Sequence, residues 1–163
     1  MSRLDSMIKR LVAQRLCLNM ACEAIAPVGG VIFEVGLGNG RTYDHLREKL
    51  PNREIYIFDR AINSHPDCRP DADHALLGEV KETLPAAAAR FAGAVALVHS
   101  DIGNGIPAYG REMAAAISRA IPQALAPGAV ILSDEELDLP DCEVLQPPDL
   151  VDLRRYFLYR KPA

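Results

Sequence analysis

The sequence predicts a doubly wound α/β fold, in which a mostly parallel sheet carries helices on both faces. Short apolar segments rich in β-branched residues alternate with amphipathic segments over most of the 163 residues, and this alternation is typical of βαβ units. The stretch 31–40 joins an apolar segment to a glycine-rich turn and then to a helical segment. In open parallel sheets such a junction borders the crevice where ligands bind.

Length and charge narrow the class of protein. One domain fits residues 1–163, with an N-terminal helix at 1–27 and a core at 31–163. A net charge of −4 argues against a nucleic-acid partner, because nucleic-acid binding requires a basic surface. No segment reaches the roughly 18 unbroken apolar residues of a membrane span, and the N-terminus does not resemble a secretory signal. We expect a cytoplasmic protein with no membrane partner.

The N-terminal segment 3–26 has the apolar spacing of an amphipathic helix, which Pro27 and the pair Gly29-Gly30 should end. A helix placed before the first strand has three roles open to it. It can pack against one face of the sheet, cover the ligand crevice or contact another subunit.

The strand predicted at 31–35 runs into glycines at alternate positions, Gly36, Gly38 and Gly40. A dinucleotide-binding turn has the spacing G-x-G-x-x-G, but Arg41 stands at the third glycine position here. This departure weakens a nicotinamide interpretation. Asn39 is expected to cap the helix that begins at Arg41. Glu34 lies near the end of a buried strand and therefore requires a polar partner.

Together, Glu34-Val-Gly-Leu-Gly-Asn-Gly40 resembles the first motif, E/D-x-G-x-G-x-G, of class I S-adenosylmethionine-dependent methyltransferases. The stretch Leu125-Ala-Pro-Gly-Ala-Val-Ile-Leu-Ser-Asp134 resembles the L-x-P-G-G-x-x-x-x-D of that family, with Ala129 in place of the second glycine. The resemblance implies a seven-stranded Rossmann-like sheet whose last strand is antiparallel, and S-adenosylmethionine as cofactor. It also implies that the cofactor's amino acid part is held by Glu34 and by the loop residues Gly36, Leu37, Gly38, Asn39 and Gly40.

Acidic residues end three further predicted strands. Asp59, followed by Arg60, ends the strand at 54–59 and is expected to accept hydrogen bonds from the two hydroxyls of an adenosine ribose; the alternative is a cap for the next turn. In the family, a carboxylate placed like Glu79 reads the adenine amine, and the alternative is a surface residue at a helix start. Asp101 ends the fourth strand. We assign Asp59, Arg60, Glu79 and Asp101 to the cofactor site.

Acids and histidines of this sequence have two further roles open to them, metal binding and general base catalysis. Asp101, Asp134 and Glu135 could share a divalent cation at the ends of neighbouring strands. Metal-dependent O-methyltransferases resemble this arrangement but have an amide where this chain has Glu135, so no metal ligand is assigned. His45 and His99 are candidate bases, but His99 lies inside a strand and is expected to be a packed residue. No catalytic residue is assigned.

The remaining elements follow from their spacing. The segment 62–73 is expected to be a solvated loop, because its histidines and Cys68 match no zinc-binding spacing. Helices are predicted at 81–91, with Pro85 in the first turn, and at 109–126, where Pro122 should kink or split the helix. A strand at 129–134 and a hairpin made of 142–146 and 156–160 should complete the sheet.

The sequence therefore predicts a methyltransferase that uses S-adenosylmethionine and transfers the methyl group in line to an oxygen or nitrogen of a small-molecule acceptor. A chain this short has no separate substrate domain, so a neighbouring subunit is expected to help close the pocket and a homo-oligomer is predicted. Two alternatives stay open. One is a nicotinamide-dependent oxidoreductase, and the other is a non-catalytic cofactor-binding or assembly protein of the same fold.

Overall fold

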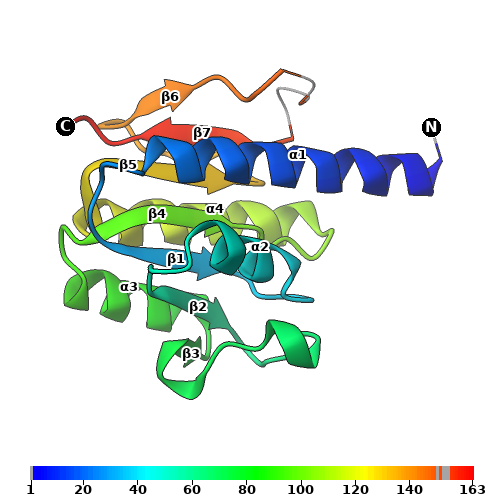
Figure 1. The fold of residues 1–163 in the computed structure, drawn as a ribbon, viewed down its shortest axis with the longest axis horizontal. Coiled ribbons are helices and arrows are strands. Elements are labelled where there is room, and N and C mark those ends of the chain that lie inside the picture. The colour runs from blue at the N-terminus through cyan, green and yellow to red at the C-terminus, as the bar shows by residue number, and fades with distance from the viewer. Residues whose placement is uncertain (1, 150, 152–154) are drawn as a thin grey trace.

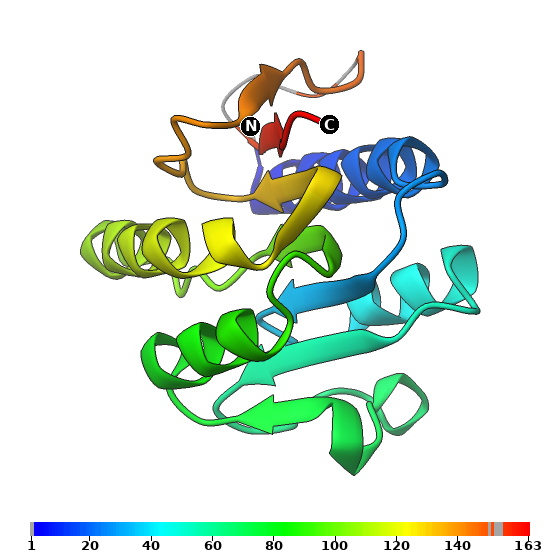
Figure 2. The same cartoon turned by 90° about the vertical axis from the view of Figure 1, so that its left-hand side faces the viewer.

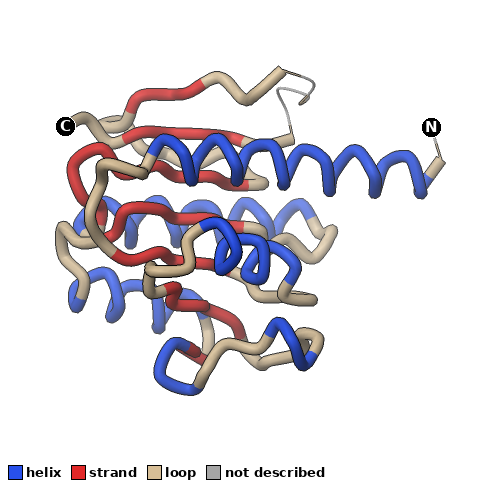
Figure 3. Tube along the Cα trace, viewed as in Figure 1, coloured by secondary structure: helices blue, strands red, loops and turns tan. Residues whose placement is uncertain are grey.

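The computed structural model describes residues 2–149, 151 and 155–163, and contains a seven-stranded sheet flanked by helices (Figures 1 and 3). The strands are β1 (Val31–Val35), β2 (Ile55–Asp59), β3 (Ala75–Leu77), β4 (Val95–Ser100), β5 (Leu125–Ser133), β6 (Glu143–Leu145) and β7 (Phe157–Arg160). Their order across the sheet is β3-β2-β1-β4-β5-β7-β6. Strands β1 to β5 are parallel, and β7 is antiparallel to both β5 and β6. The predicted fold class is confirmed, including the antiparallel strand near the C-terminus.

The long helices lie on both faces of the sheet (Figure 2). They are α1 (Arg3–Ala24), α2 (Arg41–Lys49), α3 (Val80–Arg90) and α4 (Pro107–Ala120). One buried cluster joins α1 and α2 to side chains of the sheet, and a second joins α3 and α4 to the opposite face. Each central strand is therefore covered on both sides, which explains why these strands are continuous apolar runs.

Helix α1 begins with a capping box, in which the hydroxyl of Ser2 accepts from the amide of Asp5 at 3.0 Å and the carboxylate of Asp5 accepts from the amide of Ser2 at 3.1 Å. Its C-terminal half buries small and apolar side chains against the sheet. Its N-terminal half extends beyond the strands, at the N-terminal end of the chain in Figure 1. The C-terminal half of α1 thus packs against the sheet, and the N-terminal half lies beside the carboxyl ends of the strands.

Three local predictions need correction. Pro85 is the sixth residue of α3 rather than part of the first turn; it faces solvent, so the carbonyl of Lys81 that loses its partner is open to water. Gly40, and not Asn39, is the N-cap residue of α2. Strand β5 begins at Leu125, four residues earlier than predicted, because the chain straightens directly after the 3₁₀ turn that holds Pro122. That turn ends the helix predicted at 109–126, because α4 stops at Ala120 and the chain passes from the turn into β5.

The carboxyl edge of the sheet brings the loops after the strands together. Backbone hydrogen bonds continue just past the strand ends: the amide of Gly36 donates to the carbonyl of Phe58, the amide of Asp101 to that of Val35, and the amide of Asp134 to that of Ser100. The residues that follow β1, β4 and β5 are therefore held in fixed positions beside one another. In the part of the chain that the structure describes, no helix has the length and apolar character needed to cross a membrane.

Candidate functional site

Two adjoining hollows lie at the carboxyl edge, around the loop after β1. The α1-side hollow has a volume of about 280 Å³ and is walled on one side by Arg10, Gln14 and other residues of α1. The β2-side hollow has a volume of about 170 Å³ and is bordered by the residues that follow β2 and β3. Both hollows are lined by Gly36, Gly38, Asp101 and Gly103. They form one crevice at the place predicted from the sequence.

Two glycines of the loop shape this crevice for different reasons. Gly36 has a φ of 96°, and a Cβ at this position would lie 2.6 Å from the carbonyl oxygen of Asp101. The loop after β4 can approach only because that side chain is absent. Gly38 has a φ of 49°, and a Cβ there would meet nothing within 4 Å. Gly38 leaves open the space that a ligand would occupy.

The other loop residues have structural contacts. Leu37 is buried in the core under α1 and α2. A Cβ on Gly40 would lie 2.6 Å from the Cβ of Cys68, so the third glycine lets the segment 64–68 pack against the start of α2. Asn39 lines the α1-side hollow, and its carbonyl accepts from the amide of His65 at 3.4 Å.

Asp59 holds the glycine loop from the end of β2. Its Oδ2 accepts from the amides of Leu37 at 2.9 Å and Gly38 at 3.2 Å, and its Oδ1 accepts from the amide of Arg60 at 2.7 Å. A carboxylate has about four acceptor positions, so these three bonds leave capacity for a further donor. Asp59 and Arg60 both line the β2-side hollow. The ribose contact stays a prediction.

Glu79 also lines the β2-side hollow, beside Val80. It occupies the N-cap position of α3, but its side chain makes no capping hydrogen bond. The carboxylate is thus close to the crevice and not used by the helix, which is the position that reading an adenine amine would require. The role of Glu79 in that contact stays a prediction.

Glu34 lies beneath the loop and has no exposed surface. Its carboxylate is hydrogen-bonded to His99 Nδ1 at 2.7 Å and to the hydroxyl of Thr42. These two residues are the polar partners that the sequence required. Burial alone would lower the pKa of His99, but the charge and the hydrogen bond of Glu34 outweigh it and raise that pKa. A direct contact of Glu34 with a cofactor stays a prediction.

The histidines do not face the crevice. His99 is fully buried in β4, which confirms the prediction of a packed residue. His45 Nε2 lies 2.8 Å from Asn19 Oδ1, between α2 and α1. The segment 62–73 contains two 3₁₀ turns, Pro66–Cys68 and Ala72–His74.

Asp101 is the acid that connects the sheet to α1. Arg10 donates through Nη2 to its two oxygens at 2.6 and 2.7 Å, and Gln14 donates to the same carboxylate. The hydroxyl of Tyr156 lies 3.4 Å from it. Burial opposes ionisation of Asp101, but the hydrogen bond and charge of Arg10 outweigh burial and lower its pKa.

Asp134 lies beside Asp101 at the end of β5. Burial, together with the charge of Asp101 and a hydrogen bond between the two carboxyls, raises the pKa of Asp134 to about 7. Its Oδ1 has no partner among the described residues. A proton on Asp134 supplies the donor that this pair of acids otherwise lacks. The two carboxyls therefore share one proton near neutral pH.

The hypothesis of a shared cation gains no support from the geometry. Among residues 2–149, 151 and 155–163, no three of the side chains that bind metals are grouped closely enough to hold one. Glu135 packs against Gly110 in α4 rather than facing Asp101. Arg10 donates to Asp101, and the raised pKa of Asp134 favours a proton on that second carboxyl.

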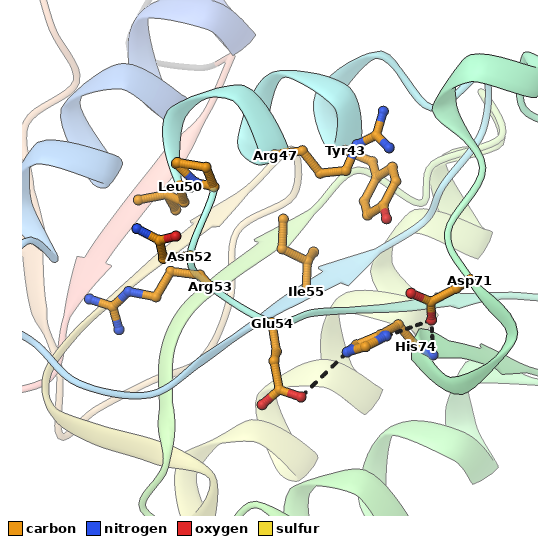
Figure 4. A pocket seen from close by; sticks show the side chains of 10 residues that line it. Tyr43, Arg47, Leu50, Asn52, Arg53, Glu54, Ile55, Asp71 and His74 are labelled. Carbon is orange, nitrogen blue, oxygen red and sulfur yellow. Dashed lines mark hydrogen bonds and ion pairs between the residues drawn. The ribbon is translucent and has the colours of Figure 1, made fainter.

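A separate hollow of about 440 Å³ lies near the amino end of β2 (Figure 4). Two of the charged side chains that line it already have partners. Arg53 donates to the carbonyls of Val28 at 2.6 Å and Gly30 at 2.9 Å. His74 lies 2.6 Å from Asp71 and 3.5 Å from Glu54. These contacts hold the turn between α1 and β1 and the segment before β3, so this hollow is a structural feature.

Sequence reasoning did not identify Arg10, Gln14 or Tyr156 as site residues. Arg10 and Gln14 are four positions apart, so they lie on one side of α1 next to its apolar stripe. This pairing of polar residues beside an apolar stripe was the available signal. Tyr156 left no such signal.

Comparison with known proteins decides the family. Residues 1–161 match the profile of a family described as S-adenosyl-L-methionine methyltransferase. The chain belongs to this family. It is therefore a methyltransferase with S-adenosylmethionine as its cofactor. A search of curated proteins found no match.

The solved structures agree with this family of methyltransferases. An S-adenosyl-L-methionine methyl transferase from Silicibacter pomeroyi DSS-3 is 42% identical, with a TM-score of 0.93 and coverage of 99% of both chains. A Burkholderia thailandensis 1,6-didemethyltoxoflavin-N1-methyltransferase is 15% identical, with a TM-score of 0.55 and coverage of 93% of this chain and 79% of that one. A 16S rRNA adenine methyltransferase from Catenulisporales acidiphilia is 13% identical, with a TM-score of 0.53 and coverage of 90% and 92%. These last two share the fold of this methyltransferase.

Proposed function

We propose that this methyltransferase transfers the methyl group in line to an oxygen or nitrogen of a small-molecule acceptor. The observation that carries the proposal is the acidic crevice. The carboxylates of Asp59, Glu79 and Asp101 line the crevice of a chain with a net charge of −4, which disfavours a polyanion such as RNA. The two hollows on either side of Gly38, of about 280 and 170 Å³, have a size suited to the cofactor rather than to a macromolecule.

The residues of the crevice fit the cofactor. S-adenosylmethionine supplies a methyl group on a cationic sulfonium, which is a good leaving group. Gly38 leaves room for a ligand against the loop backbone. Asp59 and Glu79 offer acceptors for the hydroxyls and the amine of a nucleoside in the β2-side hollow. The acids of the crevice favour a ligand that carries positive charge.

Positioning is the main contribution that we infer for the protein. Holding the acceptor behind the methyl carbon can be worth about 7–11 kcal/mol of the barrier. A dedicated catalytic residue is therefore not required, and we assign none. The family match overturns the nicotinamide alternative, as the glycine spacing had already indicated.

Two predictions on the state of the protein remain proposals: that it is cytoplasmic, and that it is a homo-oligomer. Leu4, Met7, Ile8 and Leu11 are exposed on the N-terminal half of α1, and they support the second. Light scattering at several protein concentrations measures the oligomeric state. A monomer at all concentrations would remove α1 as a subunit contact.

The test of the acceptor class uses cofactor with an isotopically labelled methyl group. The purified protein is incubated with a panel of small phenols, amines and hydroxy acids, and in parallel with total RNA. We expect labelled product of low mass and formation of S-adenosylhomocysteine, both lost in Gly38→Val. Label found only in RNA contradicts the proposal, and cofactor binding without turnover on any acceptor favours a binding or assembly role.

A further inference from the structure

An ion pair between α1 and the loop after β4 closes one wall of the α1-side hollow. Arg10 meets both oxygens of Asp101, at 2.6 and 2.7 Å, and both residues line the hollow beside the glycine loop. The side chain of Arg10 is 44% exposed, whereas that of Asp101 is only 9% exposed. The guanidinium is therefore the member of the pair that can move.

The other acids near the loop are already engaged. Glu34 is enclosed and paired with His99 and Thr42, and Asp59 holds the loop amides from the β2 side. Asp101 is the carboxylate at the α1-side hollow whose partner is a partly exposed cation. An incoming ammonium group meets Asp101 before it could meet Glu34, which has no exposed surface.

The ligand end that belongs in this hollow carries the same two charges as the pair. The amino acid part of S-adenosylmethionine has one ammonium and one carboxylate. We propose that Arg10 and Asp101 form a two-point clamp for this part, in which Arg10 binds the carboxylate and Asp101 accepts from the ammonium. The inference rests on the proposed placement of the nucleoside in the β2-side hollow, which leaves the amino acid part on the α1 side of Gly38.

The neighbours of the pair would allow Arg10 to leave Asp101 and bind the carboxylate of the ligand. Gln14 and Tyr156 contact Asp101 and keep its carboxylate in place when Arg10 turns toward the ligand. A guanidinium can bind a carboxylate through two parallel hydrogen bonds, so Arg10 exchanges one carboxylate partner for another. Neither charge of the amino acid part is left unpaired in the liganded state, because each of the two meets one member of the clamp. Cofactor binding is thereby linked to the position of α1.

Calorimetry with three ligands tests the clamp without any acceptor. S-adenosylhomocysteine carries the whole amino acid part, its decarboxylated analogue lacks the carboxylate, and 5′-methylthioadenosine lacks the amino acid part. Arg10→Ala should weaken S-adenosylhomocysteine by about tenfold to a hundredfold, as for loss of a hydrogen bond between charged groups. The same variant should change the affinity of 5′-methylthioadenosine by less than about twofold on this account.

The decarboxylated analogue allows the loss of Arg10 to be compared with the loss of the ligand's carboxylate. The wild-type protein should bind it more weakly than S-adenosylhomocysteine, and Arg10→Ala should bind both with similar affinity. Arg10→Lys should lie between the wild type and Arg10→Ala, because it keeps the charge and loses the planar fork. Arg15→Ala, which removes an exposed arginine from the same helix, is the matched control and should bind all three ligands like the wild type.

Two results would overturn the clamp. One is an unchanged affinity of Arg10→Ala for S-adenosylhomocysteine, and the other is an equal loss for all three ligands, which would indicate a structural role of α1. Thermal melting of each variant without ligand reports folding. Since no acceptor is present, failure of the small-molecule acceptor proposal leaves these affinities unaffected.

Discussion

The two hollows of the crevice are built in different ways. The β2-side hollow is formed by the glycine loop and by residues that directly follow β2 and β3, and Asp59 secures it through backbone amides. The α1-side hollow rests on buried charges from distant segments: Glu34 with His99, and Asp101 with Arg10 and Asp134. Substitutions in the β2-side hollow should act on ligand binding. Substitutions at the α1-side hollow should also change the stability of the protein and the pH dependence of that stability.

The largest expected effect is on the buried pair beneath the α1-side hollow. Glu34→Ala leaves His99 and Thr42 without their partner, and we expect a loss of about 3–5 kcal/mol in the free energy of unfolding. Urea unfolding followed by circular dichroism measures it. Glu34→Gln keeps hydrogen-bonding capacity and should lose less. Equal midpoints for wild type and Glu34→Ala would show that the pair does not support the fold.

The next effect concerns the two carboxyls at the ends of β4 and β5. The pKa of Asp134 is raised to about 7 in the folded protein, above its ordinary value of 3.8, so the folded state keeps a proton that the unfolded chain releases. Stability from this group is therefore lost as the pH rises from about 4 to about 7, by up to about 1.4 kcal/mol per pH unit.

Asp134→Asn should flatten this dependence, since an amide donates to Asp101 at every pH. Urea unfolding across that pH range compares the variant with the wild type. Asp101 and His99 also titrate, but mostly outside the range from pH 4 to pH 7. The pKa of Asp101 is lowered, so its contribution to stability is lost as the pH falls below about 4. The pKa of His99 is raised, so its contribution is lost as the pH rises above 6.5, the ordinary pKa of histidine. A slope that persists unchanged in Asp134→Asn would contradict the shared proton.

A pair of glycine variants separates fold from ligand binding at the boundary of the two hollows. Gly36→Ala places a Cβ against the carbonyl of Asp101 and should cost about 1–3 kcal/mol of stability from overpacking, in addition to the backbone strain at a φ of 96°. Gly38→Ala meets no protein atom, so it should cost only the backbone strain of about 1–2 kcal/mol but weaken cofactor binding. Thermal melting and calorimetry on both variants test this. An undiminished affinity in Gly38→Ala would remove Gly38 from the site.

The smallest expected effect is on ligand binding in the β2-side hollow. Asp59→Ala should weaken adenosine, 5′-methylthioadenosine and S-adenosylhomocysteine alike, by about tenfold, because all three carry the ribose. This pattern is the opposite of that expected for Arg10→Ala. Calorimetry with the same ligand set measures it, and a loss confined to S-adenosylhomocysteine would mean that Asp59 lies at the amino acid end instead.

Much of the fold and one side of the site could be predicted because the signals are local. The run 31–40 specifies a strand, a turn and a helix start through its own side chains. Asp59 marks the end of β2, and Glu79 lies two residues after β3, at the start of α3. Local signals misplaced details that depend on packing. Asn39 has the chemistry of a cap, but the cap position falls to Gly40, whose φ of 79° suits glycine and whose missing side chain leaves room for Cys68.

The sequence by itself determined the α/β class, the order of the elements and the place of the crevice, since these follow from hydrophobic periodicity and from residues adjacent in the chain. The partners of the buried charges were decided only by the tertiary structure. His99 lies 65 positions from Glu34, and Arg10 lies 91 positions from Asp101. A carboxylate requires some partner wherever it is buried, but which partner it meets depends on which strands become neighbours and where α1 crosses their ends.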